Sequence, residues 1–127
     1  MKPQSFSLLP GEWAVLKLPP DSPIPTWTTF PSTLISVTRT ADELSIVAPC
    51  SILPAEISAE RGWSLLQLKG PFAFNQTGIL ASIAVPLAHA GVGIFALSTF
   101  NTDYLLVKTD QRSIALDALQ AAGHIQQ

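Results

Sequence analysis

The chain of 127 residues contains a long stretch without charge. No Asp, Glu, Lys or Arg occurs between Lys69 and Asp103, although the chain as a whole carries seven basic and nine acidic residues. The charged fraction of the whole chain is 13%, about half of the quarter that is typical of soluble domains. The fold must therefore place this stretch away from water, in a membrane, in a core or in an interface with another subunit.

The membrane alternative concerns residues 79–97, a segment of nineteen residues without a charge. Its length is close to the roughly 20 residues that a membrane-spanning helix needs. Pro86, His89 and the glycine-rich break at 91–93 divide it into two apolar pieces that are each too short to span a bilayer. We therefore expect a buried helix followed by a buried strand, and no membrane partner.

Composition excludes further classes of protein. A formal net charge of −2 lacks the basic surface that nucleic-acid binding requires. The single cysteine, Cys50, cannot form an internal disulfide, which is typical of a reducing compartment, and we expect a cytoplasmic protein. The N-terminal segment has one lysine and a short apolar run that Pro10 interrupts, which is not a secretory signal.

Apolar patterns predict most of the strands. Residues 12–18 and 63–68 each read as a single strand. Residues 33–47 and 93–108 each contain two β-rich runs separated by turn residues, which predicts two hairpins. Five prolines between residues 19 and 31 exclude a regular helix there.

The remaining segments predict three helices. They are a short helix within 51–61 that starts near Pro54, a helix from an N-cap at Asn75 to about Ala90, and a last helix over 111–122 with Asp110 as its cap. A glycine directly follows the second and third of these, as it does at many helix ends.

The order of these elements repeats. The strand that begins at Trp13 matches the strand that begins at Trp63, and the hairpin over 35–47 matches the hairpin over 95–107. The second copy reads β-α-β-β-α. In the first copy a proline-rich loop replaces the first helix.

The predicted fold class is therefore α+β, with two ferredoxin-like (βαββαβ) units whose antiparallel sheets carry helices on one face. The units are residues 1–61, which are degenerate, and residues 62–127. Because the second unit lacks an evident final strand and the first unit lacks a helix, we expect the two to be interlocked.

Residues 70–107 (GPFAFNQTGILASIAVPLAHAGVGIFALSTFNTDYLLV) carry a family resemblance. Its most diagnostic pieces are residues 77–80, 86–87 and 98–103. Together with the repeat, this segment resembles ACT domains, specifically small tandem ACT-domain proteins, and is similar to the ACT domains of cytosolic arginine sensors and of aspartokinase-type regulatory domains. The resemblance covers residues 63–123 and extends more weakly over 6–60.

The resemblance implies a regulatory module that binds a small molecule, usually an amino acid, and works as a homodimer or a higher homo-oligomer. Gln76 stands where the arginine sensors have an acidic residue that helps to hold the guanidinium, and Asp103 matches their second acidic contact. One carboxylate in place of two removes a charge-assisted pairing worth roughly 1.5–3 kcal/mol. A neutral amino acid therefore stays open beside arginine.

The residues support a binding site independently of the resemblance. A helix that begins after the loop 70–75 presents unpaired amides and a partial positive charge, which suit a carboxylate, and Gly78 permits close approach. The loop 98–103 offers hydroxyls, carbonyls and the Asp103 carboxylate, which suit an ammonium group. The predicted ligand-binding residues are Phe72, Ala73, Phe74, Asn75, Gln76, Thr77, Gly78, Ile79, Ser98, Thr99, Phe100, Asn101 and Asp103.

Simpler explanations exist for the same residues. The segment 71–78 is also what a loop and helix cap require, and Asp103 also suits the turn of a hairpin. The aromatic residues Phe72, Phe74 and Phe100 are typical of a core or an interface as well as of a ligand contact.

No catalytic signature is present. His89 and His124 have no Cys or carboxylate at ligand spacing, so we expect no metal, no cofactor and no catalytic residue. The leading hypothesis is a non-catalytic regulatory module that binds an amino acid at an ACT–ACT interface and signals to a separate regulated protein. The alternative is a structural or protein-interaction ACT-like dimer that has lost ligand binding. A small enzyme stays a third hypothesis, because a fold does not determine a function.

Overall fold

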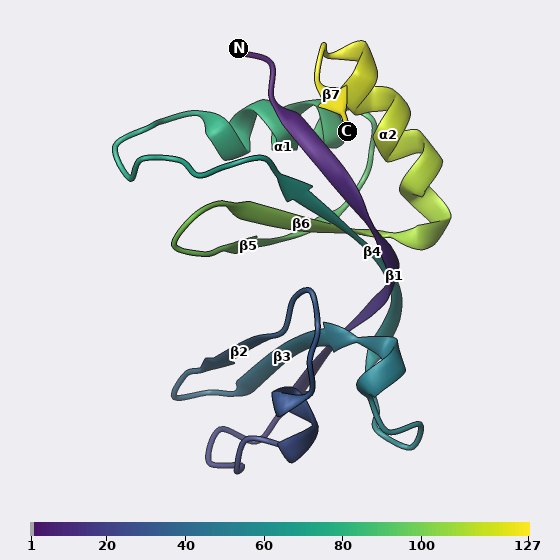
Figure 1. The fold of residues 1–127 in the computed structure, drawn as a ribbon. Coiled ribbons are helices and arrows are strands. Elements are labelled where there is room, and N and C mark those ends of the chain that lie inside the picture. The colour runs from purple at the N-terminus through teal and green to yellow at the C-terminus, as the bar shows by residue number, and fades with distance from the viewer. Residues whose placement is uncertain (1) are drawn as a thin grey trace. The chain divides into compact units, whose positions relative to one another are not determined.

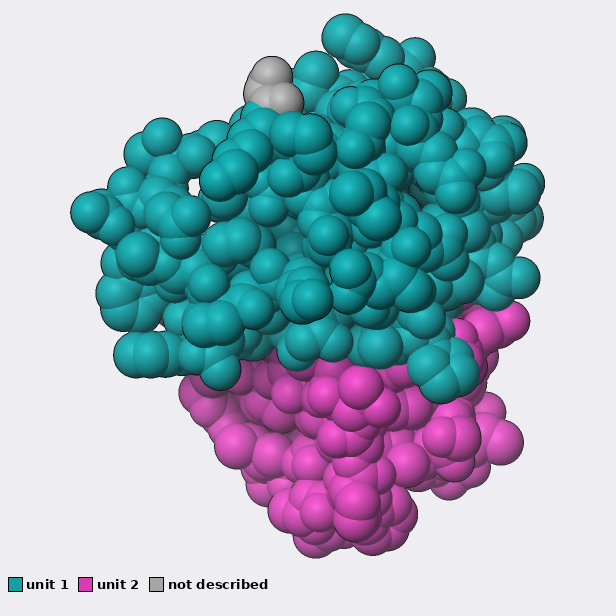
Figure 2. All heavy atoms as spheres, turned by 45° about the horizontal axis from the view of Figure 1, so that its top comes forward, with its two compact units in different colours: residues 1–10, 63–127 teal, residues 11–62 magenta. Residues whose placement is uncertain are grey.

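The α+β chain, described for residues 2–127 by a computed structural model, divides into two units (Figures 1 and 2). Unit 1 consists of the residues up to Pro10 together with residues 63–127, and unit 2 consists of residues 11–62. Each unit has its own cluster of buried apolar side chains. Each can therefore be described as a separate core.

Two strands cross from one unit into the other. Strand β1 (Ser5–Leu18) crosses at Gly11, and strand β4 (Glu60–Leu68) crosses at Gly62. Both glycines have a positive φ, 95° and 81°, a backbone conformation in which a side chain would be strained. The chain thus passes between the units inside strands. The repeat units 1–61 and 62–127 stay a prediction.

Unit 1 has the element order β4–α1–β5–β6–α2–β7. In its sheet the first residues of β1 lie between β7 and β4, β6 follows β4, and β5 is the outer strand. The strands β4, β6 and β5 pair antiparallel. The elements after β4 are α1 (Ile79–His89), β5 (Ile94–Ser98), β6 (Asp103–Lys108), a 3-10 turn (Thr109–Gln111), α2 (Arg112–Ala121) and β7 (Ile125–Gln126).

The core of unit 1 lies between this sheet and its two helices. Alternate residues of β4 and β6 point toward the helices, because side chains alternate along a strand. They meet the apolar sides of α1 and α2 and the fully buried Phe6 of β1. The buried residues of this cluster are Phe6, Leu66, Leu68, Ile83, Leu87, Val92, Leu105, Val107, Ala115 and Leu119. Both helices therefore pack on the same face of the sheet (Figure 1).

Unit 2 contains β2 (Ser36–Arg39), β3 (Leu44–Pro49) and the second part of β1. β3 pairs antiparallel with both β1 and β2. In place of an α-helix, the proline-rich segment forms a 3-10 turn (Thr26–Thr29), and its Trp27 is buried in the core of the unit. The proline-rich segment thus supplies apolar cover for this sheet.

Several sequence predictions are confirmed. Both predicted hairpins form, β2 with β3 and β5 with β6. Residues 79–97 form the helix α1 and the strand β5, as expected for a segment that does not span a membrane. Among residues 2–127, no helix combines the length and the apolar character that crossing a membrane requires.

The helix predicted over 51–61 is wrong. Only a 3-10 turn (Cys50–Ile52) forms, Leu53 is extended, and β4 already begins at Glu60. The physical reason is that Glu60 and Arg61 already belong to β4, so Pro54 begins only a single turn, closed by the hydrogen bond from the Ile57 N–H to the Pro54 carbonyl (3.2 Å).

Both predicted helix caps are also wrong. Asn75 lies in a turn closed by the hydrogen bond from the Gln76 amide to the Ala73 carbonyl (3.0 Å), so α1 begins only after Gly78. Asp110 lies inside the 3-10 turn, and Gln111 precedes α2 without a side-chain cap. In both cases a local turn takes up the capping residue before the helix begins.

The expectation that the C-terminal repeat unit, residues 62–127, lacks a final strand is wrong as well. Residues 125–126 form the short strand β7, which pairs parallel with Ser5 and Phe6 of β1. Sequence pattern cannot show a strand of two residues, because period-two alternation needs at least four.

His124 joins three segments of unit 1 that are far apart in the sequence. It is buried, with 5% of its surface exposed. Its Nδ1 accepts a hydrogen bond from the backbone N–H of Gln4 (3.0 Å), and its Nε2 lies 2.7 Å from the carbonyl oxygen of Ser82 in α1. Since Nδ1 accepts, Nε2 carries the proton and donates it to Ser82. A neutral imidazole thus holds the N-terminal strand and the first turn of α1 together.

Candidate functional site

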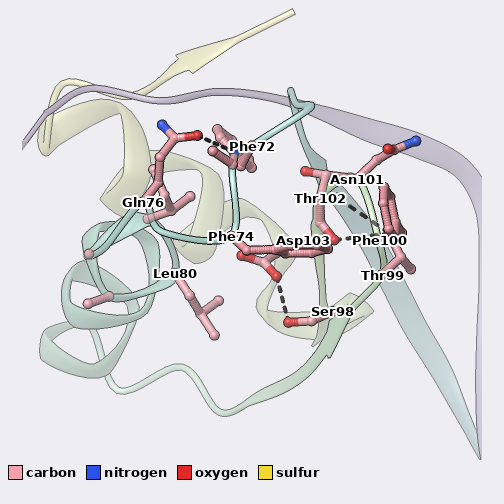
Figure 3. A pocket seen from close by; sticks show the side chains of 14 residues that line it. Phe72, Phe74, Gln76, Leu80, Ser98, Thr99, Phe100, Asn101, Thr102 and Asp103 are labelled. Carbon is pink, nitrogen blue, oxygen red and sulfur yellow. Dashed lines mark hydrogen bonds between the residues drawn. The ribbon is translucent and has the colours of Figure 1, made fainter.

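A cavity of about 400 Å³ lies in unit 1 between the start of α1 and the β5–β6 hairpin loop (Figure 3). Cavities that bind small molecules usually measure about 300–1,000 Å³. The cavity is lined by Phe72, Ala73, Phe74, Gln76, Gly78, Ile79, Leu80, Ala81, Ser98, Thr99, Phe100, Asn101, Thr102 and Asp103. Two loops that are distant in sequence therefore form one site.

Backbone contacts fix these two loops against each other. The Phe72 N–H donates to the carbonyl of Asn101 (2.9 Å), and the buried hydroxyl of Thr102 donates to the carbonyl of Leu68 at the end of β4 (2.8 Å). Gly70 lies so close to the hairpin that a Cβ there would stand 2.7 Å from the Asn101 carbonyl oxygen. Only a residue without a side chain fits at this point, so the walls of the cavity are held at a fixed separation.

The start of α1 forms the wall that carries backbone donors. Gly78 precedes the helix with a φ of 77°, and its carbonyl accepts from the Ser82 amide (3.0 Å). The amides of the first helical turn have no partner within the helix and carry a partial positive charge. Gly78, Ile79, Leu80 and Ala81 all line the cavity. This wall therefore suits a carboxylate.

The hairpin loop forms the wall that carries acceptors. Asp103 is the only charged residue among those that line the cavity, and it is half-buried. Its Oδ1 accepts a hydrogen bond from the Ser98 hydroxyl at 2.6 Å, which Figure 3 shows. The carboxylate is thereby oriented and can accept a further hydrogen bond from a cation.

Gln76 does not extend into the cavity as a free amide. Its side-chain oxygen accepts a hydrogen bond from the Ala73 N–H at 2.6 Å and so stabilises its own loop (Figure 3). The Gln76 side chain thus shapes the wall of the cavity. The resemblance to arginine sensors leads us to expect it to face the ligand.

Two phenylalanines meet at the rim of the cavity. The rings of Phe74 and Phe100 make an edge-to-face contact, with centroids 5.0 Å apart and planes at 83°. Both side chains stay about four-fifths exposed, at 80% and 79%. Exposure of two large apolar rings at one place is typical of a surface that a ligand or another protein covers.

Most of the residues predicted from sequence lie together here, and two do not. Asn75 does not line the cavity, and Thr77 lines a separate cavity of about 260 Å³ beside Lys2 and Gln4. Sequence reasoning missed Leu80, Ala81 and Thr102. Thr102 is part of the hairpin loop and could have been predicted with it. Leu80 and Ala81 cannot be predicted without knowing that α1 starts at Ile79.

The described residues show no centre for a metal. Within residues 2–127, no three His, Cys, Asp or Glu side chains lie close enough together to hold an ion. The cavity presents backbone amides, one carboxylate, uncharged polar side chains and apolar side chains.

Comparison with known families identifies the unit that holds this cavity. A family model described as the ACT domain matches residues 58–121, half of the chain. The chain belongs to the ACT-domain family. A second family model, described as an N-terminal domain, matches residues 11–56. The ACT match includes both loops of the cavity.

The ACT domain is similar to parts of curated proteins. Subunit 1 of the cytosolic arginine sensor for mTORC1 is 40% identical over 73 residues in Rattus norvegicus and 37% identical over 73 residues in Homo sapiens. These matches cover 57% of this chain and 22% of each relative. The chain thus matches only about a fifth of the length of these relatives.

Solved structures resemble the whole ACT-domain chain. A crystal structure of an Agobacterium tumefaciens protein is 37% identical, covers 100% of this chain and 94% of its own, and has a TM-score of 0.92. The regulatory subunit of aspartate kinase from Thermus thermophilus, in its ligand-free form, has a TM-score of 0.60 at 15% identity and covers 87% of this chain and 91% of its own. The second likeness establishes the fold alone.

Proposed function

We propose that this ACT-domain protein is a non-catalytic regulatory module that binds an amino acid in the cavity between the start of α1 and the β5–β6 loop. The observation that carries the proposal is the separation of opposite groups across the cavity. Amides of the first turn of α1 lie on one wall and the Asp103 carboxylate lies on the other. An α-amino acid presents a carboxylate and an ammonium group in the same way.

The comparisons support this proposal. The relatives that match the ACT domain at 37–40% identity are named arginine sensors, which indicates binding of an amino acid for regulation. Proteins with a similar fold include a regulatory subunit of aspartate kinase. We further propose that the module acts in the cytoplasm and passes its signal to a separate regulated protein.

The proposal extends to the ancestry of the two units. The order β4–α1–β5–β6–α2–β7 of unit 1 corresponds to the ferredoxin-like βαββαβ pattern. Unit 2 has hairpin strands but only 3-10 turns, which supports the description of the N-terminal half as a degenerate copy. The repeated tryptophans Trp13 and Trp63 mark equivalent strands in this scheme.

We also propose that two copies associate along β5, so that the cavity lies at an ACT–ACT interface. β5 is an outer strand, and its residues Ile94–Ser98 include neither a charge nor a proline. Natural edge strands usually carry such residues to prevent pairing. Phe74 and Phe100 lie exposed at the rim of the cavity, and an interface with a second copy would bury them.

A thermal-stability screen against the twenty amino acids tests the binding function. A ligand at about one hundred times its dissociation constant stabilises a protein by about 2.7 kcal/mol. We expect at least one amino acid to raise the unfolding temperature in this manner, and amides or esters of that amino acid to have no effect. Absence of a shift with every amino acid at millimolar concentration would refute the proposal.

Substitution of the β5 edge tests the dimer. We expect Ile94→Lys to convert a dimer into a monomer, because two like charges would meet across the paired edges. The matched control is Val37→Lys on the outer strand β2, since Ile94 and Val37 are almost equally exposed, at 36% and 37%. Sedimentation equilibrium measures the mass of both. A dimeric Ile94→Lys variant would show that β5 is not the interface.

The alternative function, an ACT-like interaction module without a ligand, is favoured by one observation. The side chain of Gln76 is closed onto its own loop and offers the cavity no second charged group. Under this alternative the protein dimerises as above, but no amino acid stabilises it.

A further inference from the structure

The charges around the cavity limit the kind of amino acid that it can hold. Asp103 is the only charged residue of the lining, and no charge occurs anywhere between Lys69 and Asp103. If the Asp103 carboxylate pairs with the ammonium group of a bound amino acid, no second carboxylate remains for a cationic side chain. A cationic side chain of a ligand would therefore find no second carboxylate in the lining to offset its charge.

The rest of the lining is uncharged and includes apolar side chains. Phe72, Ile79 and Leu80 are half-buried and pack against the core of unit 1, so their positions are fixed. Phe74 and Phe100 form the rim through their ring contact at 5.0 Å. The side chain of a ligand whose backbone groups meet the α1 amides and Asp103 would lie against these surfaces. Apolar walls of this kind stabilise an apolar side chain in proportion to the area it buries.

Four of the uncharged polar side chains of the lining already take part in internal hydrogen bonds, and the side chain of Asn101 is exposed. The Gln76 oxygen accepts from Ala73, and the Thr102 hydroxyl donates to Leu68. The Thr99 hydroxyl donates to the carbonyl of Thr102 (3.1 Å). These oxygens can still accept from a guanidinium or a second ammonium group, but they lack the charge of a carboxylate, which would add Coulombic attraction to the hydrogen bond.

We infer that the ligand is an α-amino acid with an uncharged, apolar side chain and that arginine and lysine are disfavoured. This inference rests on the proposed function, because it describes the side chain of the ligand that the proposed site would hold. It predicts that this chain prefers a different amino acid from the arginine sensors to which its ACT domain is similar.

Lysine and norleucine form a matched pair of probes, since they differ at the end of the side chain, where lysine carries an ammonium group. We expect isothermal titration calorimetry to show that norleucine binds at least about tenfold more tightly than lysine. Phenylalanine and leucine, compared with arginine, are expected to show the same order. Equal or tighter binding of lysine or arginine would overturn the inference and leave the proposed function intact. Absence of binding by every amino acid would refute both.

A change of specificity provides the second test. Ala81 is exposed, lines the cavity and is the third residue of α1, where an acidic residue is favourable for the helix. We expect Ala81→Glu to shift the ratio of lysine to norleucine affinity toward lysine by about tenfold, because the cationic side chain then gains a carboxylate partner. Ala81→Gln has nearly the same shape without the charge and should leave the ratio unchanged.

The outcomes of this second test are also decisive. A ratio that shifts only in Ala81→Glu supports the inference, since it shows that a missing carboxylate excludes lysine from the natural site. A ratio that stays unchanged in a folded Ala81→Glu variant, or that shifts equally in Ala81→Gln, contradicts it. Circular dichroism of both variants establishes that they are folded, and the wild-type titrations decide independently of either variant.

Discussion

Asp103→Asn is expected to remove about half or more of the stabilisation that an amino acid gives to this protein. A hydrogen bond to a charged group contributes about 1.5–3 kcal/mol, so its loss should weaken binding by about ten- to a hundredfold. At a ligand concentration of about one hundred times the wild-type dissociation constant, the stabilisation should fall from about 2.7 to about 0.4–1.4 kcal/mol. Thermal unfolding with and without the ligand measures this difference.

Asparagine is the informative replacement because it preserves the local structure. Its side-chain oxygen can still accept the hydrogen bond that Ser98 donates to Asp103 Oδ1. The stability of the protein without ligand should therefore change little. The control is Asp110→Asn, in which an exposed carboxylate of the same unit outside the cavity is lost. Equal ligand responses of Asp103→Asn and the wild type would exclude Asp103 as the ammonium partner.

His124→Leu should have the largest effect on the stability of unit 1. Leucine has a similar apolar bulk but neither accepts from the Gln4 N–H nor donates to the Ser82 carbonyl. A buried polar group without a partner costs about 1–3 kcal/mol, so two such groups, partly offset by the added apolar side chain, should lower the free energy of unfolding by about 3 kcal/mol. Urea unfolding followed by far-ultraviolet circular dichroism measures this loss.

His89→Leu is the matched control for this substitution. His89 is exposed in the last turn of α1, where replacing a surface residue usually changes stability by less than about 0.5 kcal/mol. Because His124 contacts the first turn of α1 at Ser82, His124→Leu should also weaken ligand binding, whereas His89→Leu should not. Equal stability of the two variants would contradict the structural role of His124.

The strands and hairpins of this fold can be predicted from sequence because their signals are local. β5 and β6 contain continuous apolar runs separated by a short polar loop, so the hairpin follows from residues 94–108 alone. Gly91 and Gly123 both adopt a positive φ at the second residue after the end of α1 and of α2, as expected of glycines at helix ends. The division of residues 79–97 into a helix and a strand likewise follows from its proline and glycines.

The features that the sequence does not predict depend on distant partners. The strand β7 has two residues and forms through pairing with Ser5 and Phe6, more than a hundred residues away. The role of His124 depends on Gln4 and Ser82, which no periodic pattern connects to it. Tertiary hydrogen bonds of this kind carry no signature in a single sequence.

Part of the candidate site can be predicted from the sequence, because its signals are also local. Its two loops contain residue types whose chemistry is readable one segment at a time, such as Asp103 beside the hydroxyl of Ser98. The sequence does not predict the orientation of the Gln76 side chain, because this orientation depends on the turn that the side chain closes with Ala73. That turn also displaces Asn75 from the capping position.

The passage of β1 through both units has a consequence for the order in which the protein can fold. Unit 2 is continuous, from residue 11 to residue 62, so all of its strand partners are present as soon as that length of chain exists. The pairing of Ser5 with Ile125 must wait until the chain has been synthesised as far as residue 125. Contacts between such distant residues form slowly, because a long loop has to close first. The unit that holds the cavity is therefore the last to be completed.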